Sequence, residues 1–457
     1  MKTLLLLVSA ALLLPAQVKI PIEQYKLKNG LRVVLSRDNA VPAVATYLIY
    51  DIGSRAEQQG RTGFAHLFEH MMFQGTANVP KGYHMRSVQA AGGVLNASTH
   101  PDYTDYFQLV PSNKLPLVLW LEADRMRGLA INPENLKNQI DAVQEERRLR
   151  LENQPYMAAV FEKWPTLAFE NPHNQTSIIG TMEDLAASTT EHVSDFFKTY
   201  YAPNNAVLVI VGDIQPAETK KMIETYFGEI PSQPQPKPPD LSEPKPQVES
   251  AVHRDPLARV PGVIAGYPGP ERRSPDYSAM IMLDVILTGG DSSRFAQNLV
   301  KGKESVLQYQ VNPGWPFQDG SDYQDPARYS MFLLHKPNFT GKQVVEQAQE
   351  IIDSIAAKGV PAEELNRVRT FFRSARLHEL ESALNRAQLL GKYALLDNDP
   401  NLINTEMDKF LAVTPAQIQA FAKQYLRPEK RFVLEIVPAP QGPPPGAPPA
   451  AKKKEAN

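Results

Sequence analysis

Two histidines and a glutamate stand close together in an otherwise apolar stretch. Residues 63–76 read GFAHLFEHMMFQGT and contain His66, Glu69 and His70. On a helix, residues three or four positions apart share a face, so the two imidazoles can converge with the carboxylate between them. Imidazole is a common metal ligand, and this pair would supply two of the three protein ligands that a catalytic zinc usually has. The third ligand must come from elsewhere in the chain.

The apolar residues of the same stretch predict the helix that positions these side chains. Phe64, Leu67, Phe68 and Met71 recur at i, i+3, i+4 and i+7, which is typical of one buried helix face. We therefore expect a helix over residues 62–73. The order H-x-x-E-H is the inverted form of the zinc-protease helix motif. The alternative is a solvated polar face that carries two ordinary histidines.

A second predicted helix, over residues 133–153, offers the third ligand. It begins at a proline, and Leu136, Ile140, Val143 and Leu151 define its buried side. At about 100° per residue, Glu146 lies about 60° from Val143, whereas Glu145 lies about 160° away. A carboxylate beside an apolar face needs a cationic partner, and a metal would provide one. The alternative is a surface glutamate paired with a nearby arginine: Arg147, Arg148 or Arg150.

The remaining elements predict an α+β fold with helices on one face of a mixed or antiparallel sheet. Strands are expected at 31–35, 44–50, 94–99 and 105–110, and a helix at 114–128. Two further strands, 205–211 and 431–437, each follow a helix that ends in Tyr-x-x-Pro. This weak repeat predicts two homologous αβ domains.

Proline-rich segments divide the chain. Seven of the sixteen residues at 231–246 and seven of the twelve at 438–449 are proline, so both segments are expected to lack a core. Residues 1–16 have the basic start, apolar run and small-residue cleavage site of a signal peptide. The predicted organisation is a signal peptide (1–16), a metal-binding domain (17–230), a linker (231–247), a second domain (248–437) and a disordered tail (438–457).

Composition excludes several classes of function. The net charge is −2 and the chain contains no cysteine, which argues against a nucleic-acid-binding face and rules out disulfides and thiolate metal sites. With the signal peptide, this predicts a periplasmic or secreted protein with no membrane association after cleavage. The alternative is an uncleaved leader that tethers the chain to a membrane.

Several motifs in one order resemble the M16 (pitrilysin or insulinase-like) zinc peptidases. They are Gly53-Ser54-Arg55, the H-x-x-E-H stretch, Gly92-Gly93-x-x-Asn96-Ala97-x-Thr99, Asp105-Tyr106 and Glu145-Glu146-Arg147. The chain is most similar to the half-length, two-domain branch that includes bacterial members and mitochondrial processing peptidase subunits. The resemblance implies that His66, His70 and Glu146 bind Zn²⁺ and that Glu69 is the general base. It also implies that residues 94–99 form an edge strand to which substrate adds, with contacts from Val94, Asn96, Ala97 and Thr99.

The chemistry of these residues agrees with that resemblance. Zinc with three protein ligands keeps one position for water, and a nearby carboxylate can accept the proton of that water. An edge strand would hold peptides by main-chain hydrogen bonds, which tolerate many sequences and favour short or unfolded polypeptides. Either Asp141 or Asn96 could orient the histidines.

The chain departs from the family pattern in its second half. Relatives often place an Arg and a Tyr there to hold the substrate carbonyl; Tyr309 is present, but no arginine partner is evident between Leu299 and Val311. A supporting acid found in many relatives is replaced by Gln139. We therefore expect the zinc-bearing half of a two-chain clam-shell, with a second M16-like chain as a heterodimer or homodimer partner. The competing hypotheses are a non-catalytic assembly or peptide-binding subunit that retains the fold, and a ligand-binding protein with an adventitious metal site.

Overall fold

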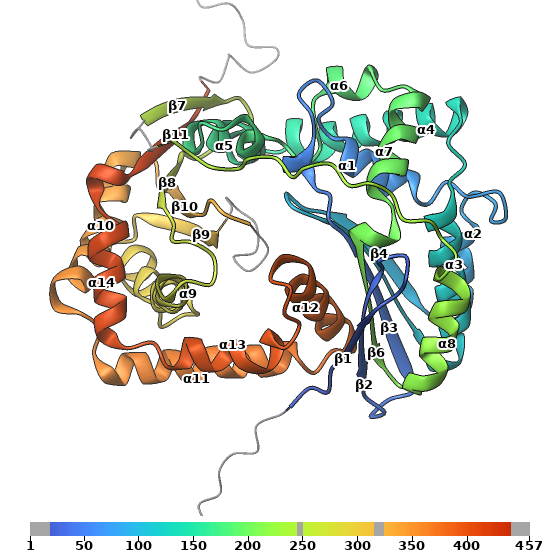
Figure 1. The fold of residues 1–457 in the computed structure, drawn as a ribbon. Coiled ribbons are helices and arrows are strands. Elements are labelled where there is room, and N and C mark those ends of the chain that lie inside the picture. The colour runs from blue at the N-terminus through green and yellow to red at the C-terminus, as the bar shows by residue number, and fades with distance from the viewer. Residues whose placement is uncertain (1–18, 245–249, 315–323, 440–457) are drawn as a thin grey trace, which may run out of the picture.

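Two β-sheets with associated helices make up the molecule, as predicted (Figure 1). The structure is a computed structural model and describes residues 19–244, 250–314 and 324–439. The first sheet has the order β1-β2-β6-β3-β5-β4 and the second the order β7-β11-β8-β10-β9. The strands of the first sheet are β1 (Glu23–Lys26), β2 (Arg32–Arg37), β3 (Ala43–Tyr50), β4 (Val94–Thr99), β5 (Thr104–Pro111) and β6 (Ala206–Gly212). Those of the second are β7 (Ser250–Asp255), β8 (Gly262–Pro268), β9 (Val306–Gly314), β10 (Arg328–His335) and β11 (Phe432–Pro438).

The two sheets share one topology, apart from the added strand β1. β2 pairs in parallel with β6, and β7 pairs in parallel with β11. The remaining pairs, β6-β3-β5-β4 and β11-β8-β10-β9, are antiparallel. The matching order supports the duplication inferred from the repeat, and it makes the edge strands β4 and β9 structural counterparts.

The structure has a helix at each of the three predicted segments, residues 62–73, 114–128 and 133–153. The first half of the chain contains α1 (Phe64–Met71), α2 (Tyr83–Ala90), α3 (Leu115–Arg127), α4 (Pro133–Arg147), α5 (Trp164–Ala168), α6 (Met182–Ala186), α7 (Thr190–Tyr200) and α8 (Pro216–Phe227). The second half contains α9 (Pro275–Thr288), α10 (Gly341–Lys358), α11 (Ala362–Glu379), α12 (Ala383–Leu396), α13 (Leu402–Leu411) and α14 (Pro415–Tyr425). The helix expected over 133–153 is α-helical as far as Arg147 and continues as a π-helical turn, Arg148–Glu152.

Both faces of the first sheet are buried. On one face, Leu48 and Leu208 pack in a core with residues of α1 and α3. On the other face, Tyr47 and Val209 pack against α12, which belongs to the second half of the chain. Gly391 permits this approach, because a Cβ there would lie 2.4 Å from Cε1 of Tyr47. The prediction of helices on one face therefore describes only the helices that come from the sheet's own half.

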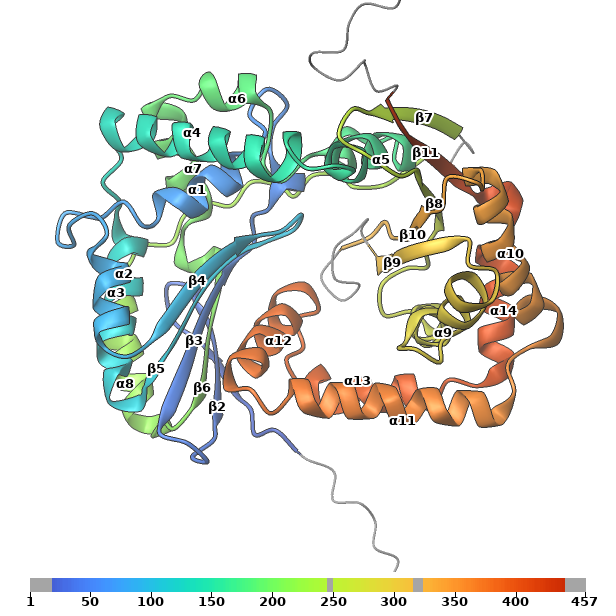
Figure 2. The same ribbon diagram turned by 180° about the vertical axis from the view of Figure 1, so that it is seen from behind.

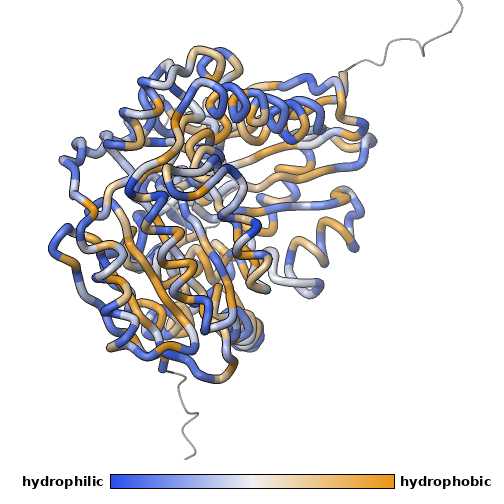
Figure 3. Tube along the Cα trace, turned by 90° about the vertical axis from the view of Figure 1, so that its right-hand side faces the viewer, coloured by the Kyte–Doolittle hydropathy of each residue, from blue (hydrophilic) through white to orange (hydrophobic). Residues whose placement is uncertain are grey.

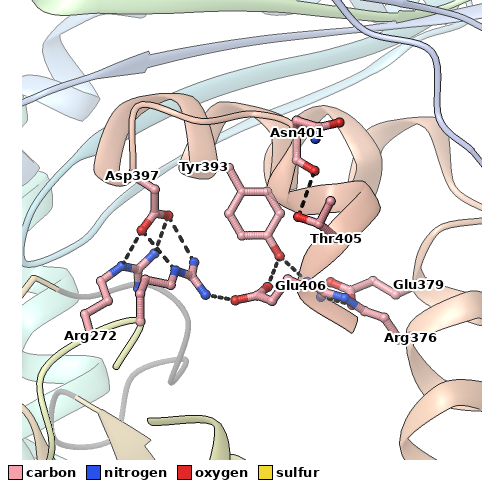
Figure 4. A network of polar contacts seen from close by, with 9 residues as sticks. Arg272, Arg376, Glu379, Tyr393, Asp397, Asn401, Thr405 and Glu406 are labelled. Carbon is pink, nitrogen blue, oxygen red and sulfur yellow. Dashed lines mark hydrogen bonds and ion pairs between the residues drawn. The ribbon is translucent and has the colours of Figure 1, made fainter. Parts of the chain in front are cut away.

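A polar network holds the end of α12 to the second body (Figure 4). Asp397, which follows α12, accepts hydrogen bonds from Arg272 (Nη2 to Oδ2, 2.9 Å) and Arg273 (Nε to Oδ1, 2.9 Å). Glu406 accepts a hydrogen bond from the hydroxyl of Tyr393 and pairs with Arg273. Burial opposes ionisation of Asp397, but the hydrogen bonds from the two arginines keep its pKa below the usual range.

The two bodies are joined at two places (Figures 1 and 2). At one end, the segment around α5 leads into the second body, where Trp164 and Ala168 are part of the core. At the other end, α11 and α13 extend toward the first sheet and carry α12. Hydrophobic and hydrophilic segments alternate along the chain trace (Figure 3).

The predicted linker is only partly within the described residues. Residues 231–244 contain neither helix nor strand, and hydrogen bonds fix them to the first body, for example from Asn204 Nδ2 to the carbonyl oxygen of Gln233 (2.7 Å). The predicted signal peptide (1–16), residues 245–247 and residues 440–457 of the predicted tail lie outside the described part of the chain. Within that part, no helix is long and apolar enough to cross a membrane.

Candidate metal centre

Helix α1 presents the two histidines beside a buried apolar face that runs along its whole length. Phe64, Leu67, Phe68 and Met71 are at most 3% exposed, so the helix is anchored by the predicted apolar face. His66 and His70 lie beside that face, and their ring centroids are 4.9 Å apart. His66 is 8% exposed and His70 is half-buried. The apolar face thus fixes the direction in which both imidazoles point.

Glu146 approaches both histidines from α4. Its Oε2 atom lies 3.3 Å from Nε2 of His70 and 3.7 Å from Nε2 of His66. Its side chain is 18% exposed, whereas that of Glu145 is 57% exposed and pairs with Arg148. The helical geometry therefore selects Glu146, as the sequence predicts. The arginine pairing considered as an alternative is also present, because Arg150 Nη1 lies 3.0 Å from Oε1 of Glu146.

The protonation tendencies of these groups suit metal ligands. Burial, reinforced by the neighbouring His70, lowers the pKa of His66 to about 4, so its ring is neutral at pH 7. The hydrogen bond from His70 lowers the pKa of Glu146 below its usual value, although burial opposes this shift. A neutral imidazole and an ionised carboxylate are the forms that coordinate a divalent cation.

Glu69 lies in the same site but is not one of the three candidate ligands. Its Oε2 atom accepts a hydrogen bond from the hydroxyl of Thr99 (2.7 Å) on β4. Burial raises the pKa of Glu69, and the Thr99 hydroxyl opposes that shift. A carboxylate with a raised pKa is a better proton acceptor than an ordinary surface glutamate. Thr99 was predicted to contact substrate, whereas here its hydroxyl contacts the candidate base.

A cavity of about 500 Å³ joins the metal cluster to the edge strand β4. Its walls are formed by the three candidate ligands and Glu69, by four residues of β4 and by apolar side chains. Arg150 lies beside the candidate ligand Glu146. The lining residues are His66, Glu69, His70, Asn96, Ala97, Ser98, Thr99, Glu146, Arg150, Leu151, Phe161, Ser177, Ile178 and Ile179. Among the strands that the structure describes, β4 pairs only with β5, which leaves its other edge available for an added strand.

Two segments of the chain match known protein families. Residues 32–182 match the family described as Insulinase (Peptidase family M16), and residues 188–372 match the Peptidase M16 inactive domain. The chain belongs to peptidase family M16. The cluster and cavity of this M16 chain lie within the first matched segment, and the second half matches a domain described as inactive.

Several known proteins are similar to this chain in sequence or in fold. The zinc protease PqqE of Helicobacter pylori is 27% identical over 421 residues, which cover 91% of this M16 chain and 93% of that protein. The crystal structure of a protease from H. pylori matches with a TM-score of 0.85 at 25% identity and covers 92% of this chain and 100% of that one. The periplasmic protease PqqL from Escherichia coli has the same fold, with a TM-score of 0.74 at 18% identity; the match covers 92% of this chain and 48% of PqqL.

The residues of this M16 site fit a zinc ion. Ligand atoms of His66, His70 and Glu146 all lie within 4.8 Å of one another. Two histidines and one glutamate form a donor set found in catalytic zinc sites that keep one position for water. Glu69 is close by and is not needed as a ligand, so it is available for proton transfer.

Not every predicted residue reaches the cavity. The prediction that Asp141 could orient the histidines is wrong, because its side chain is 59% exposed and pairs with Lys137. Asn96 lines the cavity, whereas Val94, at the start of β4, is 57% exposed and lies outside the lining. Tyr309 lies on β9 of the second sheet, where its hydroxyl is 3.1 Å from Oγ of Ser293.

Sequence reasoning missed the apolar side of the cavity. Phe161 lies within a π-helical segment, Ala159–Lys163, and residues 177–179 belong to a loop. Neither region carries a periodic pattern that would have placed it beside the metal cluster. Arg150 had a local signal, since it stands four positions after Glu146 on the same helical run.

Proposed function

We propose that this chain is a zinc-dependent endopeptidase that cleaves short or unfolded polypeptides. His66, His70 and Glu146 would hold the zinc ion, and Glu69 would act as the general base. The observation that carries the proposal is the placement of a His-His-Glu cluster, a separate buried carboxylate and a free strand edge around one cavity. Each part alone is common, but zinc-dependent hydrolysis of a peptide that binds as an added strand uses all three.

The chain's own residues divide the work of hydrolysis. Zinc, when bound, polarises a carbonyl and lowers the pKa of a water molecule to about 7. Glu69 would accept the proton of that water, while the hydroxyl of Thr99 holds the carboxylate in place. The free backbone groups of β4, with Asn96 and Ala97 facing the cavity, would bind the substrate as an added antiparallel or parallel strand. A folded substrate could not offer such a strand, hence the preference for unfolded chains.

A second M16-like chain is part of this proposal. All the lining residues of the cavity come from residues 66–179, so none of the second body's described residues lines it. The match to PqqL covers 48% of that protein, which leaves room there for a further segment of similar length. The partner would be a heterodimer subunit or a second copy. Light scattering of the purified chain, with and without candidate partners, tests this; a fully active monomer would contradict it.

We also propose that the protein is periplasmic or secreted after removal of residues 1–16. The support is the apolar N-terminal run with its small-residue cleavage site. N-terminal sequencing of the protein from its native host should begin at Gln17. A protein that retains Met1 and stays with the membrane fraction would contradict the proposal.

The decisive experiment combines metal content with cleavage by a base-deficient variant. We expect about one zinc per chain, chelator-sensitive cleavage of an unstructured peptide, and a loss of at least about 100-fold in kcat for Glu69→Gln with zinc retained. Glu145→Gln, which changes an exposed neighbour of the ligand, is the matched control and should keep full activity. A folded, metal-free and inert wild-type protein would instead support a non-catalytic assembly or peptide-binding subunit.

A further inference from the structure

The first turn of α1 lacks a cap from its own flanking residue. Gly63 precedes the helix with a φ of 83° and offers no side chain to its free N–H groups. Those groups are satisfied by Glu57, whose Oε2 accepts from the backbone N–H of Gly63 (2.8 Å) and whose Oε1 accepts from that of Ala65 (2.7 Å). The residue after Ala65 is His66, so Glu57 accepts a hydrogen bond from the backbone immediately before the first candidate ligand.

Glu57 is itself fixed to the turn that connects β4 and β5. It follows a short 3₁₀ helix, Ser54–Ala56, whose backbone N–H groups at Ser54 and Arg55 donate to the carbonyl oxygens of His100 (3.2 Å) and Pro101 (2.9 Å). Gly53 lies so close to this turn that a Cβ would be 2.4 Å from either oxygen. The segment 53–57 is therefore a rigid connection between the base of the edge strand and the metal-binding helix.

A buried ion pair strengthens the same connection. Nε of Arg55 donates to Oδ1 of Asp102 at 2.8 Å, and both side chains are at most 3% exposed. Arg55 Nη2 also donates to the carbonyl oxygen of Gln324 (2.9 Å), which follows β9 in the chain. The Gly53-Ser54-Arg55 motif thus has a structural task, which is to hold Glu57 at a fixed place beneath α1.

We propose that Glu57 is a positioning residue of the metal centre, whose carboxylate sets the location of His66 and His70 relative to β4. The distance between the metal and the edge strand decides whether a bound peptide carbonyl reaches the metal, so a small displacement of α1 would impair both coordination and cleavage. This inference rests on the proposed zinc site and assigns it a residue outside the cavity lining.

The environment of Glu57 agrees with that task. The residue is 4% exposed, and its carboxylate lies at the positive end of the α1 dipole, where negative charge is stabilised. Burial raises the pKa of Glu57 to about 8, and the backbone N–H groups of Ala65 and Gly63 oppose this shift. The two N–H groups and the helix dipole thus offset part of the cost of burying this carboxyl group at the first turn of α1.

The test measures zinc affinity rather than activity alone. In Glu57→Gln, the side-chain amide group must face one of the two N–H donors, so we expect zinc affinity to fall about 10- to 100-fold in chelator competition, as for residues that orient ligands. We also expect kcat to fall while KM changes by less than about twofold, because the strand edge of β4 is unaltered. Unchanged zinc affinity and kcat in the folded variant would overturn the proposal.

Two controls separate positioning from general destabilisation. Asp284→Asn replaces another buried acid, far from α1 in the second body, and should leave zinc affinity unchanged even if it alters stability. Glu57→Asp keeps the charge but is too short to bridge both N–H groups; it should weaken zinc binding and serves if Glu57→Gln does not fold. Equal affinity for Glu57→Asp and wild type would count against the proposal.

Hydrogen exchange of the metal-free wild type tests directly whether Glu57 holds the first turn of α1. The amides of Gly63 and Ala65 should exchange slowly with deuterium even without zinc, because their partner is a buried carboxylate. Fast exchange at both amides would overturn the proposal whatever the metal does. A wild-type protein that binds no zinc but protects these amides would refute the proposed function. Glu57 would then be a helix cap without a role at a metal site.

Discussion

At the residue scale, the site depends on which of two neighbouring glutamates turns inward. Glu145 and Glu146 are adjacent in sequence, yet only Glu146 lies on the side of α4 that faces α1. The geometry of the helix decides this, since consecutive residues point about 100° apart. The same rule places His66 and His70 together and turns Glu69 to the side of His66 away from His70, where it lies close to Thr99 rather than among the candidate ligands.

Replacing Glu146 should therefore weaken zinc binding much more than replacing Glu145. We expect Glu146→Gln to weaken zinc binding by more than the roughly 10- to 100-fold typical of residues that only orient ligands, because it removes a charged donor. Glu145→Gln should change zinc affinity by less than about threefold. Competition with a fluorescent chelator measures both, and equal effects would contradict the assignment of Glu146.

Thr99 provides a second prediction at this scale. Thr99→Val keeps the shape of the side chain but removes the hydroxyl that holds Glu69, so kcat should fall by about 10-fold while zinc content stays at one per chain. Ser98→Ala is the matched control, since the Ser98 hydroxyl donates to Asp105 instead. Steady-state kinetics with one unstructured peptide compares the two. A Thr99→Val enzyme with wild-type kcat would show that Glu69 needs no such support.

At the element scale, local patterns predicted more than distant contacts. The expected helix at 62–73 and strand at 94–99 correspond to α1 and β4, because periodic burial along one element is written in neighbouring residues. The π-helical turn after α4 was not predictable from that pattern. Likewise, β6 is buried along its whole length, which indicates cover on both faces but cannot say that α12 provides it.

The contact between α12 and the first sheet gives a prediction for this scale. In an exposed helix, Gly→Ala is stabilising by up to about 1 kcal/mol. Gly391→Ala should instead destabilise the protein by about 1–3 kcal/mol, because the new methyl would overlap the ring of Tyr47. Urea unfolding measures this. Gln388→Ala, at a half-buried position on the same helix, should change stability much less.

A double substitution checks the cause of that effect. If steric overlap destabilises Gly391→Ala, then adding Tyr47→Leu should recover part of the loss, and the two effects should not be additive. Simple additivity would indicate that the added methyl acts on the helix itself rather than on its packing against β3.

At the scale of the whole molecule, one fold serves two different tasks. Both sheets have the same strand order, but the His-His-Glu cluster found among the described residues lies beside β4 and has no counterpart beside β9. The second body instead supplies α12 to the first sheet and receives Trp164 from the first half in its own core. This exchange makes the two bodies structurally dependent, so unfolding of one should affect the other.

A buried acid in the second body lets that dependence be measured through pH. Burial raises the pKa of Asp284 to about 7, opposed by hydrogen bonds from Tyr329 and Thr288. In the unfolded chain this carboxyl ionises near its ordinary pKa of 3.8, so between these two pH values the folded state holds a proton that the unfolded state has lost. Its contribution to stability is therefore complete below pH 3.8 and declines as pH rises toward 7, by at most about 1.4 kcal/mol per pH unit.

Asp284→Asn should remove that decline. The free energy of unfolding of the variant, measured by urea at several pH values from 4 to 7, should fall less steeply with pH than that of the wild type. Asp291→Asn, at an exposed position, should follow the wild-type slope. If the two bodies unfold together, the slope difference will appear equally in fluorescence from Trp120 and Trp164, which lie in different cores. A difference confined to Trp164, whose ring lies in the second body's core, would mean that the bodies unfold separately.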